Sequence, residues 1–126
     1  MALGTAMFNG QLGAGWREPE GHFRWMKRRG VVYMGGPSRS GQRLRVEGFC
    51  PRLPEGPVKL TVSVDGRQCD PFVIDKAPER FQMECALGAE TVGKEKVEVT
   101  LEVDKPMERT GEGSELGMPM SAVSIR

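Results

Sequence analysis

The segment from Val97 to Val103 reads V-E-V-T-L-E-V, an unbroken alternation of apolar and polar side chains. Only a β-strand places successive side chains on opposite faces, so the segment is predicted to be a strand. Its valines and leucine form one face, and its glutamates and threonine form the other. One apolar face and one charged face are typical of an antiparallel sheet that is covered on one side.

Similar patterns recur along most of the chain. Strands are expected at residues 23–26, 31–34, 42–50, 58–64, 67–75, 80–87 and 120–126. Pro71 would interrupt the strand at 67–75, because proline cannot donate to a ladder of backbone hydrogen bonds. In the last strand, Met120, Ala122 and Ser124 are predicted to share one face.

Three local signals predict how these strands connect. Asp65-Gly66 predicts a type I′ hairpin turn, because that turn needs positive φ at both positions. The basic run at 27–30 predicts a charged turn that joins residues 23–26 and 31–34 as a hairpin. Gly48 interrupts the alternation and predicts a β-bulge that turns Phe49 inward.

The strand count and the chain length together predict the fold class. A chain of 126 residues is close to the commonest size of one domain. It contains 17 glycines and 9 prolines, which suits many turns and short strands. Eight or nine short strands predict an all-β, antiparallel β-sandwich, either a jelly roll or an immunoglobulin-like arrangement. Residues 1–12 are expected to be a flexible or edge-strand segment, and residues 13–126 a single domain.

The three cysteines, Cys50, Cys69 and Cys85, are odd in number and widely spaced. This pattern predicts three free thiols in a reducing compartment, with one disulfide and one remaining thiol as the alternative. The single histidine, His22, cannot complete a usual zinc site with them. No apolar run approaches the ~18 residues of a membrane span, and the start lacks the features of a signal peptide. We therefore expect a soluble cytoplasmic protein without a metal or cofactor, or a domain of a longer polypeptide.

Three segments together resemble a known bacterial domain: G-W-R-E-P-E-G-H-F-R-W-M at 15–26, residues 44–66, and residues 97–125. The domain is a β-sandwich that occurs alone or appended to glycosyltransferases and other surface-polysaccharide proteins. The resemblance implies a sugar-related context and a non-catalytic role. The positions that carry it are Trp16, Arg24, Trp25, Gly66, Leu116 and Gly117.

Four residues are the candidates for a ligand-binding surface: Trp16, Arg17, Arg24 and Trp25. An indole face packs well on the C–H face of a sugar ring, and arginine supplies hydrogen-bond donors in a planar fork. The alternative for each tryptophan is a structural place in the sandwich. For the arginines it is a solvated face or a basic patch for an anionic partner.

The expected function is carbohydrate binding, or support of a carbohydrate-active protein. The alternatives are a structural or protein-interaction domain and, less favoured, a glycan-active enzyme. The sequence argues against nucleic acid as a partner, because a base-stacking surface needs more aromatic residues. A homo-oligomer is compatible with the sequence.

Overall fold

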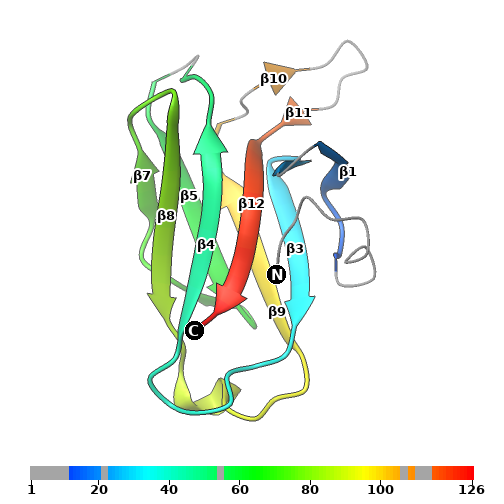
Figure 1. Ribbon diagram of the computed structural model, residues 1–126, viewed down its shortest axis with the longest axis vertical. Coiled ribbons are helices and arrows are strands. Elements are labelled where there is room, and N and C mark those ends of the chain that lie inside the picture. Colours follow the sequence, from blue (N-terminus) through cyan, green and yellow to red (C-terminus); the bar gives the residue numbers. More distant parts are fainter. Residues whose placement is uncertain (1–11, 21–22, 54–55, 106–107, 110–114) are drawn as a thin grey trace.

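The computed structural model describes residues 12–20, 23–53, 56–105, 108–109 and 115–126 of the chain, and the described part is an antiparallel β-sandwich (Figure 1). The predicted fold class is therefore confirmed. The elements are β1 (Trp16–Glu20), β2 (Phe23–Met26), β3 (Arg29–Met34), β4 (Arg43–Cys50), β5 (Val58–Val64), β6 (Arg67–Gln68), β7 (Phe72–Ile74), β8 (Glu79–Ala86), the 3-10 helix η2 (Ala89–Thr91), β9 (Val97–Val103), β10 (Glu108–Arg109), β11 (Glu115–Leu116) and β12 (Met118–Ile125).

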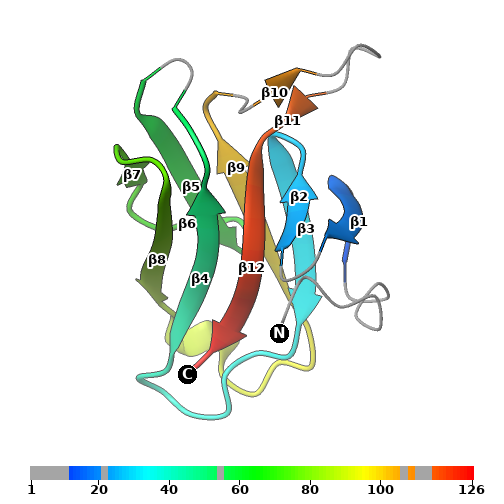
Figure 2. The same ribbon diagram turned by 45° about the horizontal axis from the view of Figure 1, so that its top comes forward.

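Two five-stranded sheets form the two layers of the sandwich (Figure 2). The first sheet has the strand order β1-β2-β12-β4-β8. The second has the order β3-β9-β5-β6, with β7 also paired to β5. β10 and β11 form a small separate ribbon. Nine of the described strands have three residues or more, in agreement with the predicted eight or nine.

The pairing pattern selects the jelly roll from the two predicted arrangements. Leaving out β1 and the two-residue strands, eight strands remain, and they pair from the ends of the chain inward. β2 pairs with β12, β3 with β9, β4 with β8, and β5 with β7. Nested antiparallel pairing of this kind is one long hairpin rolled into two facing sheets, which is the jelly-roll architecture.

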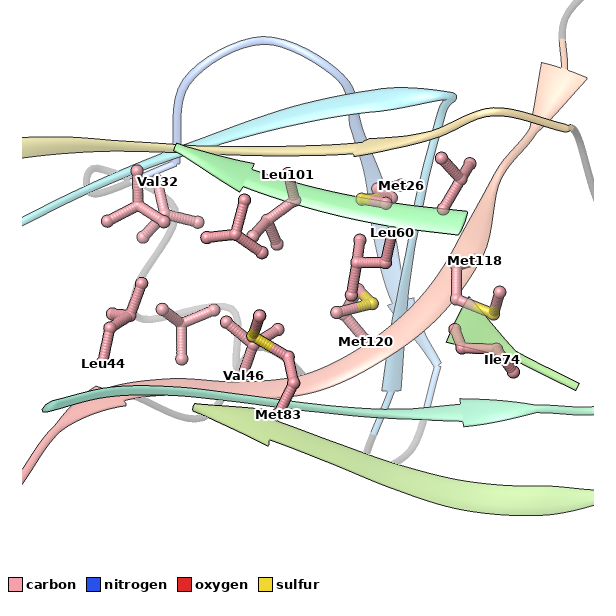
Figure 3. Close-up of a cluster of buried hydrophobic side chains, with 14 of the residues drawn as sticks. Met26, Val32, Leu44, Val46, Leu60, Ile74, Met83, Leu101, Met118 and Met120 are labelled. Atoms are coloured by element: carbon pink, nitrogen blue, oxygen red, sulfur yellow. The ribbon is translucent and has the colours of Figure 1, made fainter. Parts of the chain in front are cut away.

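Valine, leucine and methionine side chains from both sheets point toward one another and form the core (Figure 3). The strand at 97–103 behaves as predicted: its three valines and Leu101 are almost fully buried, and its glutamates are exposed. The same alternation holds in β5, where Val58, Leu60, Val62 and Val64 are buried. Period-two burial in strands from both sheets explains why the alternation in the sequence was informative.

The hairpin predicted for residues 23–34 is wrong. β2 lies in the first sheet beside β12, whereas β3 lies in the second sheet and pairs with β9 along its whole length. The basic segment at 27–28 carries the chain from one sheet to the other. Each strand pairs with a strand that is distant in the sequence. A local sequence pattern does not show which distant strand that is.

The bulge predicted at Gly48 is also misplaced. β4 pairs with β8 in an unbroken register over eight residues, so Gly48 stays on the core side. A Cβ atom there would lie only 2.5 Å from Cζ of Phe81, which explains the glycine. Phe49 consequently keeps its outward direction.

The irregularity lies instead in β12, between Met120 and Ala122. The register shift moves the core face of the strand by one residue. Met118, Met120 and Val123 are buried, while Ala122 and Ser124 are only half-buried on the outer side. The predicted face, with Met120, Ala122 and Ser124 together, is therefore wrong beyond Met120.

The prediction of three free thiols is wrong, and its stated alternative holds. Cys69 and Cys85 form a disulfide, and Cys50 is a buried free thiol. Cys69 follows β6 of the second sheet and Cys85 lies in β8 of the first, so the bond connects the two sheets at one side of the sandwich. The spacing of the cysteines in the sequence contains no sign that these two positions face each other.

The predicted turn after β5 is confirmed, with φ of 49° at Asp65 and 85° at Gly66. The Asp65 carboxylate accepts hydrogen bonds from the Glu98 backbone N–H at 2.9 Å and from the Lys94 ammonium at 2.6 Å. These two donors, the backbone N–H first, hold the pKa of Asp65 below its usual value. The turn is thereby tied to the start of β9.

We expect Asp65→Asn to be less stable than the wild type at pH 7 by less than about 1 kcal/mol, because the ion pair between Asp65 and Lys94 is partly exposed to water, which screens it. Asparagine tolerates the positive φ, so the backbone should not be strained. A lowered pKa in the folded state stabilises the fold above the unfolded-state pKa, about 3.9, and this stability is lost as the pH falls through the folded pKa. Urea unfolding from pH 7 to pH 2 measures the difference. A difference that stays constant over this range would contradict the assignment.

Candidate ligand-binding site

The outer face of the first sheet carries the candidate site. In β2 the burial alternates: Arg24 and Met26 are buried, while Phe23 and Trp25 are half-buried on the opposite face. In β4, the outward set continues with Arg45, Glu47 and Phe49. Aromatic and charged side chains are therefore displayed on the same side of one rigid sheet.

A hollow of about 570 Å³ lies on this face, over β4 and β8. Glu47 of β4 and Gln82 of β8 are direct cross-strand partners, so their side chains lie next to each other. The residues that line the hollow are Phe23, Glu47, Gly48, Arg80, Phe81, Gln82 and Ser121.

Four polar side chains of the hollow have unused hydrogen-bonding capacity. Within the described chain, neither Glu47 nor Arg80 nor Gln82 nor Ser121 makes a side-chain hydrogen bond or ion pair. Together they offer a carboxylate acceptor, a guanidinium donor, an amide with both functions and a hydroxyl. Ser121 comes from the irregular part of β12, which is how a bulge typically aims a side chain at a site.

An aromatic pair flanks the hollow on the β2 side. The rings of Phe23 and Phe49 lie 5.7 Å apart between centroids, with an interplanar angle of 37°. Both rings are half-buried, so part of their apolar surface stays accessible. The face thus combines an apolar flank with a polar floor.

The first predicted residue, Trp16, makes close contacts within the fold. Trp16 begins β1, and its indole N–H donates to the Val31 carbonyl at 2.8 Å. Its six-membered ring lies against Gly30, where a Cβ atom would come within 2.9 Å of it. Trp16 is half-buried and packs against the core.

The other three predicted residues lie in the paired strands β1 and β2, and Arg24 and Trp25 point to opposite faces of the sheet. Arg24 is 4% exposed and lies on the core side of β2, so it offers no open rim to a ligand. Trp25 is half-buried on the outer face, opposite Pro119 of β12. Arg17 is in β1, but its side chain lies outside the described part of the structure.

The sequence missed the residues of the hollow because they belong to four distant segments, β2, β4, β8 and β12. One signal was present: the alternation in 42–50 and 80–87 places Glu47 and Gln82 on the outer faces of their strands. That these two strands are neighbours follows only from the jelly-roll topology.

A second cleft, of about 320 Å³, lies beside the disulfide between β6 and β8. Its charged residues are largely paired: Arg67 contacts Glu90 at 3.1 Å, and Arg43 lies 4.0 Å from Glu84. The pKa of Glu90 is lowered by its own backbone N–H and by Arg67. Because these charges already interact with one another, the cleft offers less free hydrogen-bonding capacity than the hollow.

The buried thiol of Cys50 is not an activated nucleophile. Burial raises its pKa, and the thiol donates to the Arg52 carbonyl at 3.3 Å. A protonated thiol is a poor nucleophile, because the thiolate is the reactive form. Cys50 is therefore best understood as a core residue.

Comparison of the chain with protein-family models, curated proteins and solved structures found no match. Among the described residues, no three His, Cys, Asp or Glu side chains cluster as metal ligands. The same part of the chain contains no helix long and apolar enough to cross a membrane. The geometry of the hollow is thus the main guide to function.

Proposed function

We propose that this protein is a non-catalytic carbohydrate-binding jelly-roll domain and that the hollow is its site. The observation that carries the proposal is the set of four polar side chains without partners in the described chain, beside the Phe23–Phe49 pair. Sugar hydroxyls both donate and accept hydrogen bonds, so they match this mixture of groups. Sugar C–H faces match aromatic rings.

The shape of the site also favours a glycan. The hollow lies on the surface of a sheet, over the paired strands β4 and β8. A sheet holds these side chains more rigidly than a loop would, which reduces the entropy lost on binding. The resemblance to a domain of surface-polysaccharide proteins supports the same ligand class by analogy.

Binding is favoured over hydrolysis because Glu47 is the single carboxylate among the described residues that line the hollow. Glycoside hydrolases in most families use two carboxyl groups across the scissile bond. The alternative, support of a carbohydrate-active protein, would use the same face as a protein contact.

The direct test is isothermal titration calorimetry with fragments of bacterial surface polysaccharides, after a glycan array has selected them. We expect Glu47→Gln and Phe23→Ala each to weaken binding by about tenfold or more, since each removes a hydrogen bond or contact worth about 1–2 kcal/mol. Glu98→Gln is the matched control, because Glu98 is an exposed glutamate on β9 of the other sheet.

Two results would overturn the proposal. One is the absence of binding to any glycan by a correctly folded wild-type protein. The other is a glycan affinity that Glu47→Gln and Glu98→Gln leave equally unchanged, since the glycan would then bind elsewhere. The first result would favour the role of a partner for a carbohydrate-active protein.

A further inference from the structure

The edge strands of the two sheets differ in how well they are protected from pairing with another chain. On β3, the preceding segment covers the edge: the Gly13 N–H donates to the Val31 carbonyl at 2.7 Å, and the Val31 N–H donates to the Ala14 carbonyl at 3.1 Å. β1 contains Pro19 and a register shift against β2. β6 and β7 are only two and three residues long. Covers, prolines, bulges and short lengths are the usual ways to prevent pairing with another chain.

β8 has none of these protections. It is eight residues long, pairs with β4 without a break, and contains neither proline nor lysine. β8 is the last strand of its sheet, and no described strand pairs with the edge that faces away from β4. Its side chains Arg80, Gln82 and Glu84, which point away from the core, are exposed. Its free backbone groups can therefore accept another strand.

The outward residues of β8 are complementary to themselves. When two copies of β8 pair antiparallel with Gln82 opposite Gln82, Arg80 of each copy lies opposite Glu84 of the other. Two opposite-charge pairs then flank an amide pair that can form mutual hydrogen bonds. Arg80 has no partner in the described chain. Glu84 is held on the outer face by Arg45 at 3.4 Å and still has acceptor capacity for the second copy.

The backbone also fits this register. An edge strand presents the N–H and C=O groups of every second residue outward. A register centred on Gln82 pairs even-numbered residues with even-numbered ones and odd with odd. Outward-pointing groups therefore meet outward-pointing groups, whichever set faces away from β4. A shift by one residue would lose both the hydrogen bonds and the charge match.

We infer that β8 is the interface of a homodimer in which two first sheets join edge to edge. The two-fold axis passes between the paired Gln82 residues, as in an isologous contact. Residues opposite each other in a sheet share a face, so the axis leaves both hollows on the same side. The dimer presents both hollows to one surface. Arg80 and Gln82 belong both to the hollow and to the interface, so Glu47, Ser121 and Phe23 are the lining side chains that remain available to a ligand in the dimer. The dimer itself forms without a ligand.

Analytical ultracentrifugation over a range of concentrations tests the interface. The wild type should show a monomer–dimer equilibrium. Arg80→Glu should weaken it by at least about tenfold, because both charge pairs become repulsive. Glu84→Arg should do the same. Circular dichroism monitors the fold, and Arg39→Glu, at an exposed loop position, is the matched control that should dimerise like the wild type.

Mixing the two variants provides the decisive measurement. In the mixed pair, the two carboxylates of the Arg80→Glu chain lie opposite the two guanidinium groups of the Glu84→Arg chain, so a heterodimer should form with nearly wild-type affinity. A wild type that remains monomeric up to about millimolar concentration would overturn the inference. So would a dimer that Arg80→Glu leaves intact, or variants that fail to associate when mixed.

Discussion

Leu101→Ala should lower the free energy of unfolding by about 2–5 kcal/mol, because it opens a cavity in the centre of the sandwich. Leu101 is fully buried in β9 (Figure 3). β9 is the inner strand between β3 and β5, and Leu101 is paired with Gly30 on one side and Val62 on the other. The space over Gly30 is filled by the Trp16 ring, which its hydrogen bond to the Val31 carbonyl holds in place, so the surroundings of Leu101 cannot easily collapse into the cavity.

Glu102→Ala, the adjacent change on the same strand, should cost less than about 0.5 kcal/mol. The Glu102 side chain is 59% exposed, and its carboxylate lies 4.0 Å from Arg29 in an ion pair that is equally exposed. Such pairs contribute little, because water screens them. Urea unfolding of both variants measures the contrast. Equal losses of stability would mean that the two faces of β9 are assigned the wrong way round.

The strand predictions succeeded because, as Leu101 and Glu102 illustrate, neighbouring residues of a strand lie in opposite environments. Burial on one face of a strand forces apolar residues into every second position, so the pattern at 97–103 and at 58–64 records the final environment directly. The Asp65-Gly66 turn was equally readable, because positive φ restricts the residue types at both positions.

The errors all concern interactions between distant segments. The clusters at 23–26 and 31–34 have the pattern of a hairpin, yet β2 and β3 pair with β12 and β9, which lie far along the sequence. The irregularity assigned to Gly48 lies in its neighbour β12. Glycine marked a close approach of the Phe81 ring, and a close approach and a bulge give the same signal in one sequence.

The sugar site predicted at the tryptophans stays a prediction, and the hollow that we propose as the site is lined by other residues. Aromatic residues beside polar ones led to the tryptophans, because large indole faces are the strongest single signal for a sugar. The fold uses Trp16 to cover Gly30 and leaves Phe23 and Phe49 at the hollow. The indole N–H of Trp16 donates a hydrogen bond within the fold. The sequence alone does not distinguish such a tryptophan from one that is exposed to a ligand.

The disulfide is the second feature with a large expected effect. Cys69 and Cys85 are separated by 16 residues and connect the two sheets beside β8. Closing a loop of this length restricts the unfolded chain and stabilises the folded state by about 3 kcal/mol. We therefore expect Cys69→Ala/Cys85→Ala to lower the free energy of unfolding by about this amount, measured by urea unfolding without reductant.

Reduction provides the matched control. A dithiol should destabilise the wild type by a similar amount and leave the double variant unchanged, because its remaining thiol, Cys50, has no partner to exchange with. Thiol titration of the denatured wild type without reductant should then give one thiol per chain. A disulfide is typical of proteins in an oxidising compartment. A count of three thiols would mean that the disulfide does not form, and it would support the cytoplasmic location that the sequence predicts.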